Sequence, residues 1–126
     1  MQQALARKTE ENMKHYMKLK PFPFGMIKSG RKTIELRLFD EKRQKIKVCD
    51  SIEFTNTQTG EVITAEVVAL HRFASFKELY ESLPLTKCGY TADTVENAHY
   101  TDMNEYYPEN EQEKYGVVGI ELTVKF

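Results

Sequence analysis

Residues 30–37 have the sequence GRKTIELR, in which apolar residues alternate with polar and charged ones. Successive side chains of an extended strand point to opposite faces, so Ile34 and Leu36 share one face while Glu35 and Arg37 share the other. The alternation therefore predicts a half-buried strand that carries Glu35 and Arg37 as neighbours. Lys32 has the opposite parity from Glu35, and we expect it to reach the same place only from the preceding turn.

The flanking segments carry the signals of a small mixed domain. Alternation in residues 13–19 predicts a strand that ends before Pro21, and residues 22–29 predict a short helix that Gly30 ends in a left-handed conformation. Residues 51–55 and 61–71 predict a hairpin, residues 75–78 a capping box that starts a helix, and residues 116–126 a last strand. About five to six strands with short flanking helices make an α+β domain, most simply a small closed barrel.

The length and composition fit one such domain. The chain has 126 residues and a formal net charge of −1, and we place the domain at residues 13–126 with residues 1–12 as an N-terminal extension. Neither a membrane-spanning run nor a signal peptide is evident, so we expect a soluble, cytoplasmic protein with no membrane partner. The oligomeric state stays open, with a monomer preferred. Cys49 and Cys88 lie far apart without a metal-ligand pattern, and we predict no disulfide framework, no metal and no cofactor.

Charge is unevenly distributed along the chain. Residues 28–47 carry eight lysines and arginines against three carboxylates, whereas residues 75–126 carry ten carboxylates against four lysines. The basic segment predicts a face that attracts anions, although solvated surface lysines are an equal alternative. The tyrosines of the acidic segment could stack on nucleic-acid bases beside such a face, or simply pack; they are Tyr100, Tyr106, Tyr107 and Tyr115.

The remaining candidates for chemistry favour structural roles. His15 and His71 fall on apolar sides of their strands, and we expect each to be a core-edge histidine with one hydrogen bond. His99 has no ligand partner at helical spacing, so it does not suggest a metal site. Ser75 lacks the sequence context of a serine hydrolase and is expected to cap a helix.

The ordered string of these segments resembles the ASCH domain, a branch of the PUA-like β-barrels, over residues 13–126. The family pattern G-x-K-x-x-E-x-R corresponds here to Gly30, Lys32, Glu35 and Arg37. The order and spacing of bacterial ASCH proteins are matched around it by HYMKL at 15–19, PF at 23–24, DEKR at 40–43, DSIEF at 50–54 and KYGVVGI at 114–120.

The resemblance implies a barrel with a cleft lined by the lysine, glutamate and arginine of the motif. The wider superfamily binds RNA or modified nucleosides, and the ASCH family includes proteins linked to transcription coactivation, an amidohydrolase acting on N4-acetylcytidine and a ribonuclease. Two positions depart from the family pattern. Glu35 stands where the amidohydrolase branch has a threonine nucleophile, and Cys49 stands where relatives usually have glycine before the aspartate, which concerns a turn rather than chemistry.

Three hypotheses about function follow. The first is a module that binds RNA, a nucleotide or a modified nucleoside; the second is a hydrolase, either a ribonuclease or an amidohydrolase on acylated cytidine; the third is a scaffold that recruits a protein through residues 108–114. For the second, Lys32 and Glu35 are the candidate catalytic residues. The purely structural alternative is that Glu35 and Arg37 form a surface ion pair that contributes roughly 0–1 kcal/mol to the stability of the fold. The candidate substrate-binding residues are Arg31, Lys32, Thr33, Glu35, Arg37, Lys42, Arg43 and Tyr107.

Overall fold

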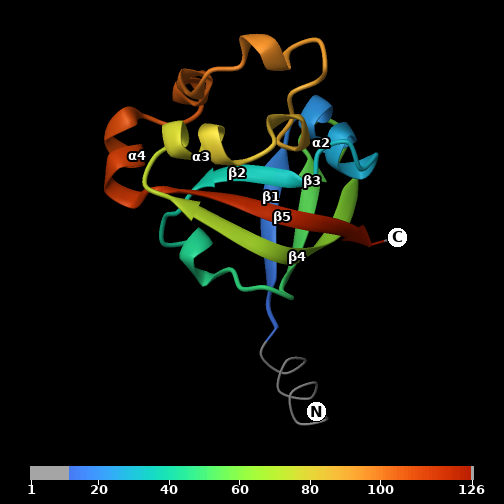
Figure 1. The fold of residues 1–126 in the computed structure, drawn as a ribbon. Coiled ribbons are helices and arrows are strands. Elements are labelled where there is room, and N and C mark those ends of the chain that lie inside the picture. Colours follow the sequence, from blue (N-terminus) through green and yellow to red (C-terminus); the bar gives the residue numbers. More distant parts are fainter. Residues whose placement is uncertain (1–11, 126) are drawn as a thin grey trace.

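A computed structural model describes residues 12–125 and shows one strongly curled sheet with short helices around it (Figure 1). The five strands of this described part of the chain run in the order β1-β3-β4-β5-β2, with β1 parallel to β3 and all other neighbours antiparallel. Their bounds are β1 Lys14–Leu19, β2 Ile34–Leu38, β3 Ser51–Asn56, β4 Val62–Phe73 and β5 Val117–Lys125. The α+β class and PUA-like architecture are confirmed. The expected closed barrel is a half-barrel instead, because the edge strands β1 and β2 are not paired with each other.

The helices are short and lie between the strands. Within residues 12–125 they are α2 Pro21–Lys28, α3 Phe76–Ser82 and α4 Glu109–Tyr115, with four 3₁₀ turns at Arg43–Lys45, Leu85–Lys87, Val95–Asn97 and Tyr100–Glu105. The chain leaves α2 through Gly30, whose φ is 83°, as predicted. At α3 the Ser75 hydroxyl accepts from the Glu78 N–H at 3.2 Å, so Ser75 caps this helix as expected. Of the predicted extension 1–12, residues 1–11 lie outside the described part of the chain.

A bulge in β4 changes which side chains face the inside of the sheet. The register shifts between Val67 and Ala69, so that Leu70 and not Ala69 lies opposite Ile120 and packs against the inner core. His71 is displaced with it and makes one contact, from Nε2 to Glu121 Oε1 at 2.9 Å. The expectation that His71 falls on the apolar side of its strand was therefore wrong, because a bulge reverses strand parity.

Two apolar clusters hold β2 from both sides. On its outer face Ile34 and Leu36 pack in a cluster with Phe76 and Leu79 of α3. On its inner face Glu35 lies opposite Ile120 of β5, and Arg37 opposite Val118, both of which belong to the inner core. The prediction that β2 is half-buried was wrong, because α3 and the chain that follows it cover the face that would otherwise meet solvent. Its charged side chains consequently lie inside the curl.

A buried pair supports the start of β1. His15 Nε2 lies 2.8 Å from Asp50 Oδ2, and His15 is only 8% exposed, which fits the expected core-edge histidine. Asp50 also accepts hydrogen bonds from the backbone N–H groups of Met13 and Lys47, each at 3.0 Å. Burial acts to raise the pKa of Asp50, but these three bonds outweigh it and lower that pKa.

Cys49, just before this aspartate, is the sole non-glycine residue between 12 and 125 with a positive φ, at 81°. A left-handed conformation costs most L-residues roughly 1–2 kcal/mol, and glycine avoids this cost. Part of that gain is offset, because glycine also increases the conformational entropy of the unfolded chain. We therefore predict that Cys49→Gly raises the free energy of unfolding by about 1 kcal/mol, measured by urea denaturation. Cys49→Ser is the matched control, since it removes the thiol and keeps the strain. Equal effects of the two variants would show that the backbone conformation is not the cause.

Candidate functional site

Glu35 is the centre of a buried group of charges on the inner face of β2. Its side chain lies with Oε1 2.7 Å from Lys32 Nζ, and its Oε2 accepts a hydrogen bond from Arg37 Nε at 2.7 Å. The contact to Lys32 is a close ion pair without aligned hydrogen-bond geometry. Burial acts to raise the pKa of Glu35, yet the two cations more than compensate and the pKa is lowered. The carboxylate is therefore ionised at neutral pH.

Lys32 reaches this carboxylate from the turn after α2, as its strand parity required. Its backbone N–H donates to Met26 O at 3.0 Å, and the next residue, Thr33, donates to Lys87 O at 2.9 Å. The side chain then runs past Gly89, where a Cβ would stand 3.5 Å from Lys32 Cδ. Cys88 is buried beside the same charges, and burial raises the pKa of its thiol to about 11. The segment after α3 thus covers Lys32, and Cys88 is a protonated thiol rather than a nucleophile.

Arg37 connects the two unpaired edges of the half-barrel. While its Nε donates to Glu35, its Nη2 donates to the backbone oxygen of Lys18 in β1 at 3.3 Å. Burial acts to lower the pKa of Arg37, but Glu35 and the Tyr107 side chain raise it, so the guanidinium is permanently charged. Tyr107 is itself placed by stacking on Phe76, with ring centroids 6.2 Å apart. The orientation of Arg37 is therefore fixed by Lys18 of β1, by Glu35 of β2 and by Tyr107, which follows the 3₁₀ turn at Tyr100–Glu105.

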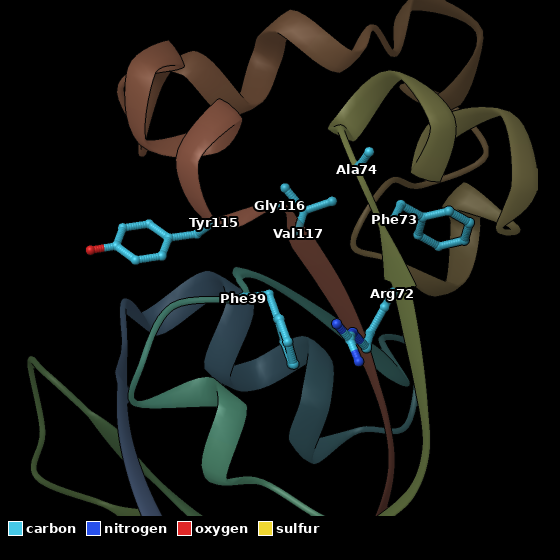
Figure 2. A pocket seen from close by; sticks show the side chains of 7 residues that line it. All are labelled: Phe39, Arg72, Phe73, Ala74, Tyr115, Gly116 and Val117. Carbon is cyan, nitrogen blue, oxygen red and sulfur yellow. The ribbon is translucent and has the colours of Figure 1, made fainter.

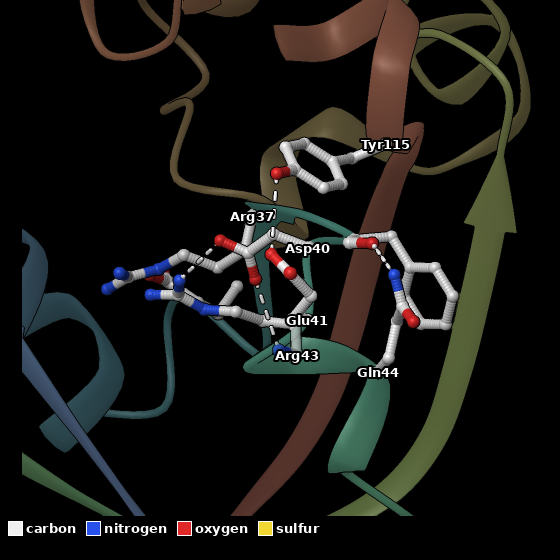
Figure 3. A network of polar contacts seen from close by, with 8 residues as sticks. Arg37, Asp40, Glu41, Arg43, Gln44 and Tyr115 are labelled. Atoms are coloured by element: carbon white, nitrogen blue, oxygen red, sulfur yellow. Dashed lines mark hydrogen bonds and ion pairs between the residues drawn. The ribbon is translucent and has the colours of Figure 1, made fainter.

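A cleft of about 500 Å³ opens beside Arg37 between these edges. Arg43 at its rim donates from Nη1 to Asp40 Oδ2 at 3.0 Å, while its buried Nε has no hydrogen-bond partner among residues 12–125. Figure 3 shows the guanidinium groups of Arg37 and Arg43 on the same side of the loop 39–45. Four cationic side chains line the cleft and no described aspartate or glutamate does, so it attracts anions. Its lining residues are Tyr16, Met17, Lys18, Arg37, Lys42, Arg43 and Thr55.

The structure brings most of the predicted site residues together and separates two. Lys32, Glu35, Arg37 and Tyr107 form one buried network, and Arg37, Lys42 and Arg43 meet at the cleft. Arg31 is instead exposed at the opposite end of β2, where its Nε donates to Ser29 Oγ at 3.1 Å. The backbone of Thr33 is hydrogen-bonded on both sides: its N–H donates to Lys87 O, and its carbonyl oxygen accepts from the Leu122 N–H. These two therefore lie outside the cleft.

Two further residues, Tyr16 and Lys18, were not predicted as site residues but line the cleft from the edge strand β1. Tyr16 is 57% exposed, and its ring presents a large apolar face to solvent. The alternation in residues 13–19 does assign both side chains to the polar face of β1. Nothing in that alternation says that β1 comes to lie beside β2, because this depends on the curl of the sheet.

The other sequence candidates are accounted for by local contacts. His99 caps the 3₁₀ turn at Tyr100–Glu105, accepting from the Thr101 N–H at 3.3 Å. No cluster of three or more histidine, cysteine, aspartate or glutamate side chains suited to a metal ion occurs within residues 12–125. None of the helices in that range is long and apolar enough to span a membrane.

Comparison with known proteins gives one family. The model of the ASCH domain matches residues 17–126. The crystal structure of hypothetical protein PH0355 is 34% identical, with a TM-score of 0.77, and the match covers 90% of this chain and all of that one. The solution structure of protein PF0455 from the archaeon Pyrococcus furiosus is 33% identical with a TM-score of 0.69, covering 89% and 97% of the two chains.

A third structure shares the fold at much lower sequence identity. The crystal structure of ASCH from Zymomonas mobilis has a TM-score of 0.60 at 16% identity, and the match covers 87% of this chain and 66% of that one. A search of curated proteins gives no match. Since the Pyrococcus protein is archaeal, the expectation of a specifically bacterial type is not supported.

Proposed function

The chain belongs to the ASCH domain family, which is associated with RNA binding, and from this we propose that it binds RNA, a nucleotide or a modified nucleoside in the cleft beside Arg37. The observation that carries the proposal is the lining of that cleft, where four cations converge and no lining residue is a carboxylate. Arg37 and Arg43 are each paired with a carboxylate outside the lining, Glu35 and Asp40. Residues 13–126 act as one ASCH domain in this proposal, and residues 1–12 are an extension of it.

The residues of the cleft suit the parts of a nucleotide. Lys18 and Lys42 make no ion pair with a described carboxylate and can each bind a phosphate as a point charge. Arg37 and Arg43 offer planar guanidinium groups that can bind phosphate or a base edge through paired hydrogen bonds. The exposed ring of Tyr16 gives a base a surface on which to stack. In this arrangement the cations bind the phosphate electrostatically, and the Tyr16 ring stacks on the base.

Lys32 and Glu35 act in this proposal by positioning Arg37 rather than by contacting the ligand. Glu35 is 3% exposed and both its oxygens face cations, so the ligand meets the far end of Arg37. A general base needs a pKa near the working pH, whereas that of Glu35 is lowered. These contacts favour binding over the hydrolase alternative. The third hypothesis, recruitment of a protein through residues 108–114, gains no specific contact from the structure.

Charge removal at the rim of the cleft tests the proposal. We predict that Lys18→Gln and Lys42→Gln each weaken binding several-fold and reduce the dependence of log affinity on log salt by roughly one unit, because each removes one phosphate contact. The measurement is fluorescence anisotropy of a labelled, random-sequence single-stranded RNA of about ten nucleotides. The matched control is Lys125→Gln at the end of β5, with an exposed lysine that lines no described cleft. An unchanged salt dependence in both cleft variants would contradict the assignment.

A further inference from the structure

A second pocket of about 440 Å³ shares no lining residue with the Arg37 cleft and is lined by Phe39, at the start of the loop 39–45, together with residues of β4 and β5 (Figure 2). Figure 2 shows the Arg72 side chain beside the Phe39 ring, while Tyr115 lies on the other side of Phe39 with its ring directed away from both. The guanidinium carbon of Arg72 is 4.1 Å from the centroid of the Phe39 ring. The lining is completed by Phe73, Ala74, Gly116 and Val117. The pocket lining therefore combines three aromatic residues with one cation.

The register of the sheet places this pocket in line with the first cleft. Arg37 of β2 and Arg72 of β4 both lie opposite Val118 of β5, so the three residues form one row across adjacent strands on the inner face. Two strand spacings separate the backbones of the two arginines, which is about 10 Å. Phe39 follows Arg37 at the next position of the same parity. Arg37, Phe39 and Arg72 are consequently neighbours at one end of the sheet.

The pocket is held in shape without neutralising its cation. The Phe39 backbone is fixed by two bonds of 2.9 Å, since its N–H donates to Gly116 O and its carbonyl accepts from Gln44 Nε2. The Tyr115 hydroxyl donates to Glu41 Oε1 at 3.3 Å, which orients that ring. Arg72 is exposed, and no described carboxylate comes within ion-pair distance of it. One face of its guanidinium lies over the Phe39 ring, so a base would have to stack on the opposite face.

We infer that this pocket is a second nucleotide subsite, so that the ligand is a single strand of RNA that passes the loop 39–45 with one nucleotide in each pocket. Bases stack on guanidinium planes and on aromatic rings irrespective of their identity, which suits the Arg72 plane. The inference rests on the proposed function, because the strand is anchored by its phosphates in the Arg37 cleft. It adds that a mononucleotide fills only one of the two subsites.

The test compares a strand with a mononucleotide. We expect Arg72→Gln to weaken binding of a labelled, random-sequence RNA of about ten nucleotides by roughly fivefold or more, while binding of the four nucleoside 5′-monophosphates in the Arg37 cleft, followed by NMR at the cleft residues, stays unchanged. Arg72→Lys keeps the charge and removes the stacking plane, and should recover only the salt-dependent part of the loss. Arg31→Gln, with the same charge change at the far end of β2, is the control.

The outcomes separate this inference from the proposed function. If the monophosphates bind but Arg72→Gln leaves RNA binding unchanged, the second subsite is wrong and the first cleft stands. The same conclusion follows if Arg72→Gln weakens both ligands equally, because Arg72 would then act on the first cleft. If neither RNA nor any monophosphate binds the unaltered protein, the proposed function and the inference fail together. Thermal unfolding of each variant confirms that an exposed residue has been changed without loss of the fold.

Discussion

Replacing Glu35 with glutamine should lower the free energy of unfolding by about 3 kcal/mol, the largest stability effect that we expect in this chain. The amide can keep one hydrogen bond to Arg37, but it no longer balances two cations inside the sheet. Removing one partner of a buried ion pair costs about 3–5 kcal/mol. We expect the lower end, because the Lys32 and Arg37 side chains remain 12% and 14% exposed. Urea denaturation at neutral pH, followed by circular dichroism, measures the difference.

Two further variants show whether the burial of charge is the cause. Glu53→Gln removes a carboxylate from an exposed pair, in which Glu53 lies 3.0 Å from Lys14, and should lower the free energy of unfolding far less, because solvent screens exposed ion pairs. Lys32→Met in the Glu35→Gln background removes a cation that has lost its partner, and should restore part of the stability. If Glu35→Gln costs no more than Glu53→Gln, the Glu35 group does not stabilise the fold in the way its contacts suggest.

The same carboxylate predicts how stability depends on pH. The pKa of Glu35 is lowered in the folded protein, so its contribution is fully present above the unfolded value near 4.3 and is lost as the pH falls through the folded value. Asp50 has a lowered pKa as well and adds to acid sensitivity with the same sign. Glu35→Gln should therefore flatten the fall in stability below the unfolded pKa, and the part due to Asp50 should remain.

The sequence predicts local structure here because the signals are local. The capping hydroxyl of Ser75, the left-handed Gly30 and the alternation of β1 each depend on neighbouring residues, and each prediction is confirmed. Strand parity likewise predicted that Lys32 must come from a turn. The side chains of Lys32, Glu35 and Arg37 do meet, but they do so on the inner face of β2. The local sequence pattern could not show whether the charged face of this strand is buried or exposed.

What the sequence could not predict depends on contacts between distant segments. Lys18 reaches Arg37 only because the sheet curls until its edges approach each other. Arg72 comes into line with Arg37 only because a bulge shifts the parity of β4 by one residue. Both arrangements involve pairs of residues far apart in the chain, and neither bulge nor curl has a signal in the alternation itself.

Replacing Arg37 with lysine should weaken RNA binding by about tenfold or more, a larger loss than that from any single rim lysine. One guanidinium donates from Nε to Glu35 and from Nη2 to Lys18 O, and still presents nitrogen donors to the cleft. A lysine ammonium is a point charge that cannot make these contacts in one plane. The ammonium group would pair with Glu35 in the interior. It would then lose the contact to the Lys18 backbone oxygen in β1 and the contact to the ligand.

The comparison of Arg37→Lys with Arg37→Ala decides between charge and geometry. If Arg37 acts through its planar fork, both variants lose affinity to a similar extent, as measured by RNA anisotropy at a temperature where each is folded. Arg31→Lys is the control, because Arg31 is exposed and, within residues 12–125, its side chain donates only to Ser29. Full affinity of Arg37→Lys together with loss in Arg37→Ala would show that positive charge alone matters. In that case Glu35 and Lys18 would stabilise the fold without orienting a ligand-binding group.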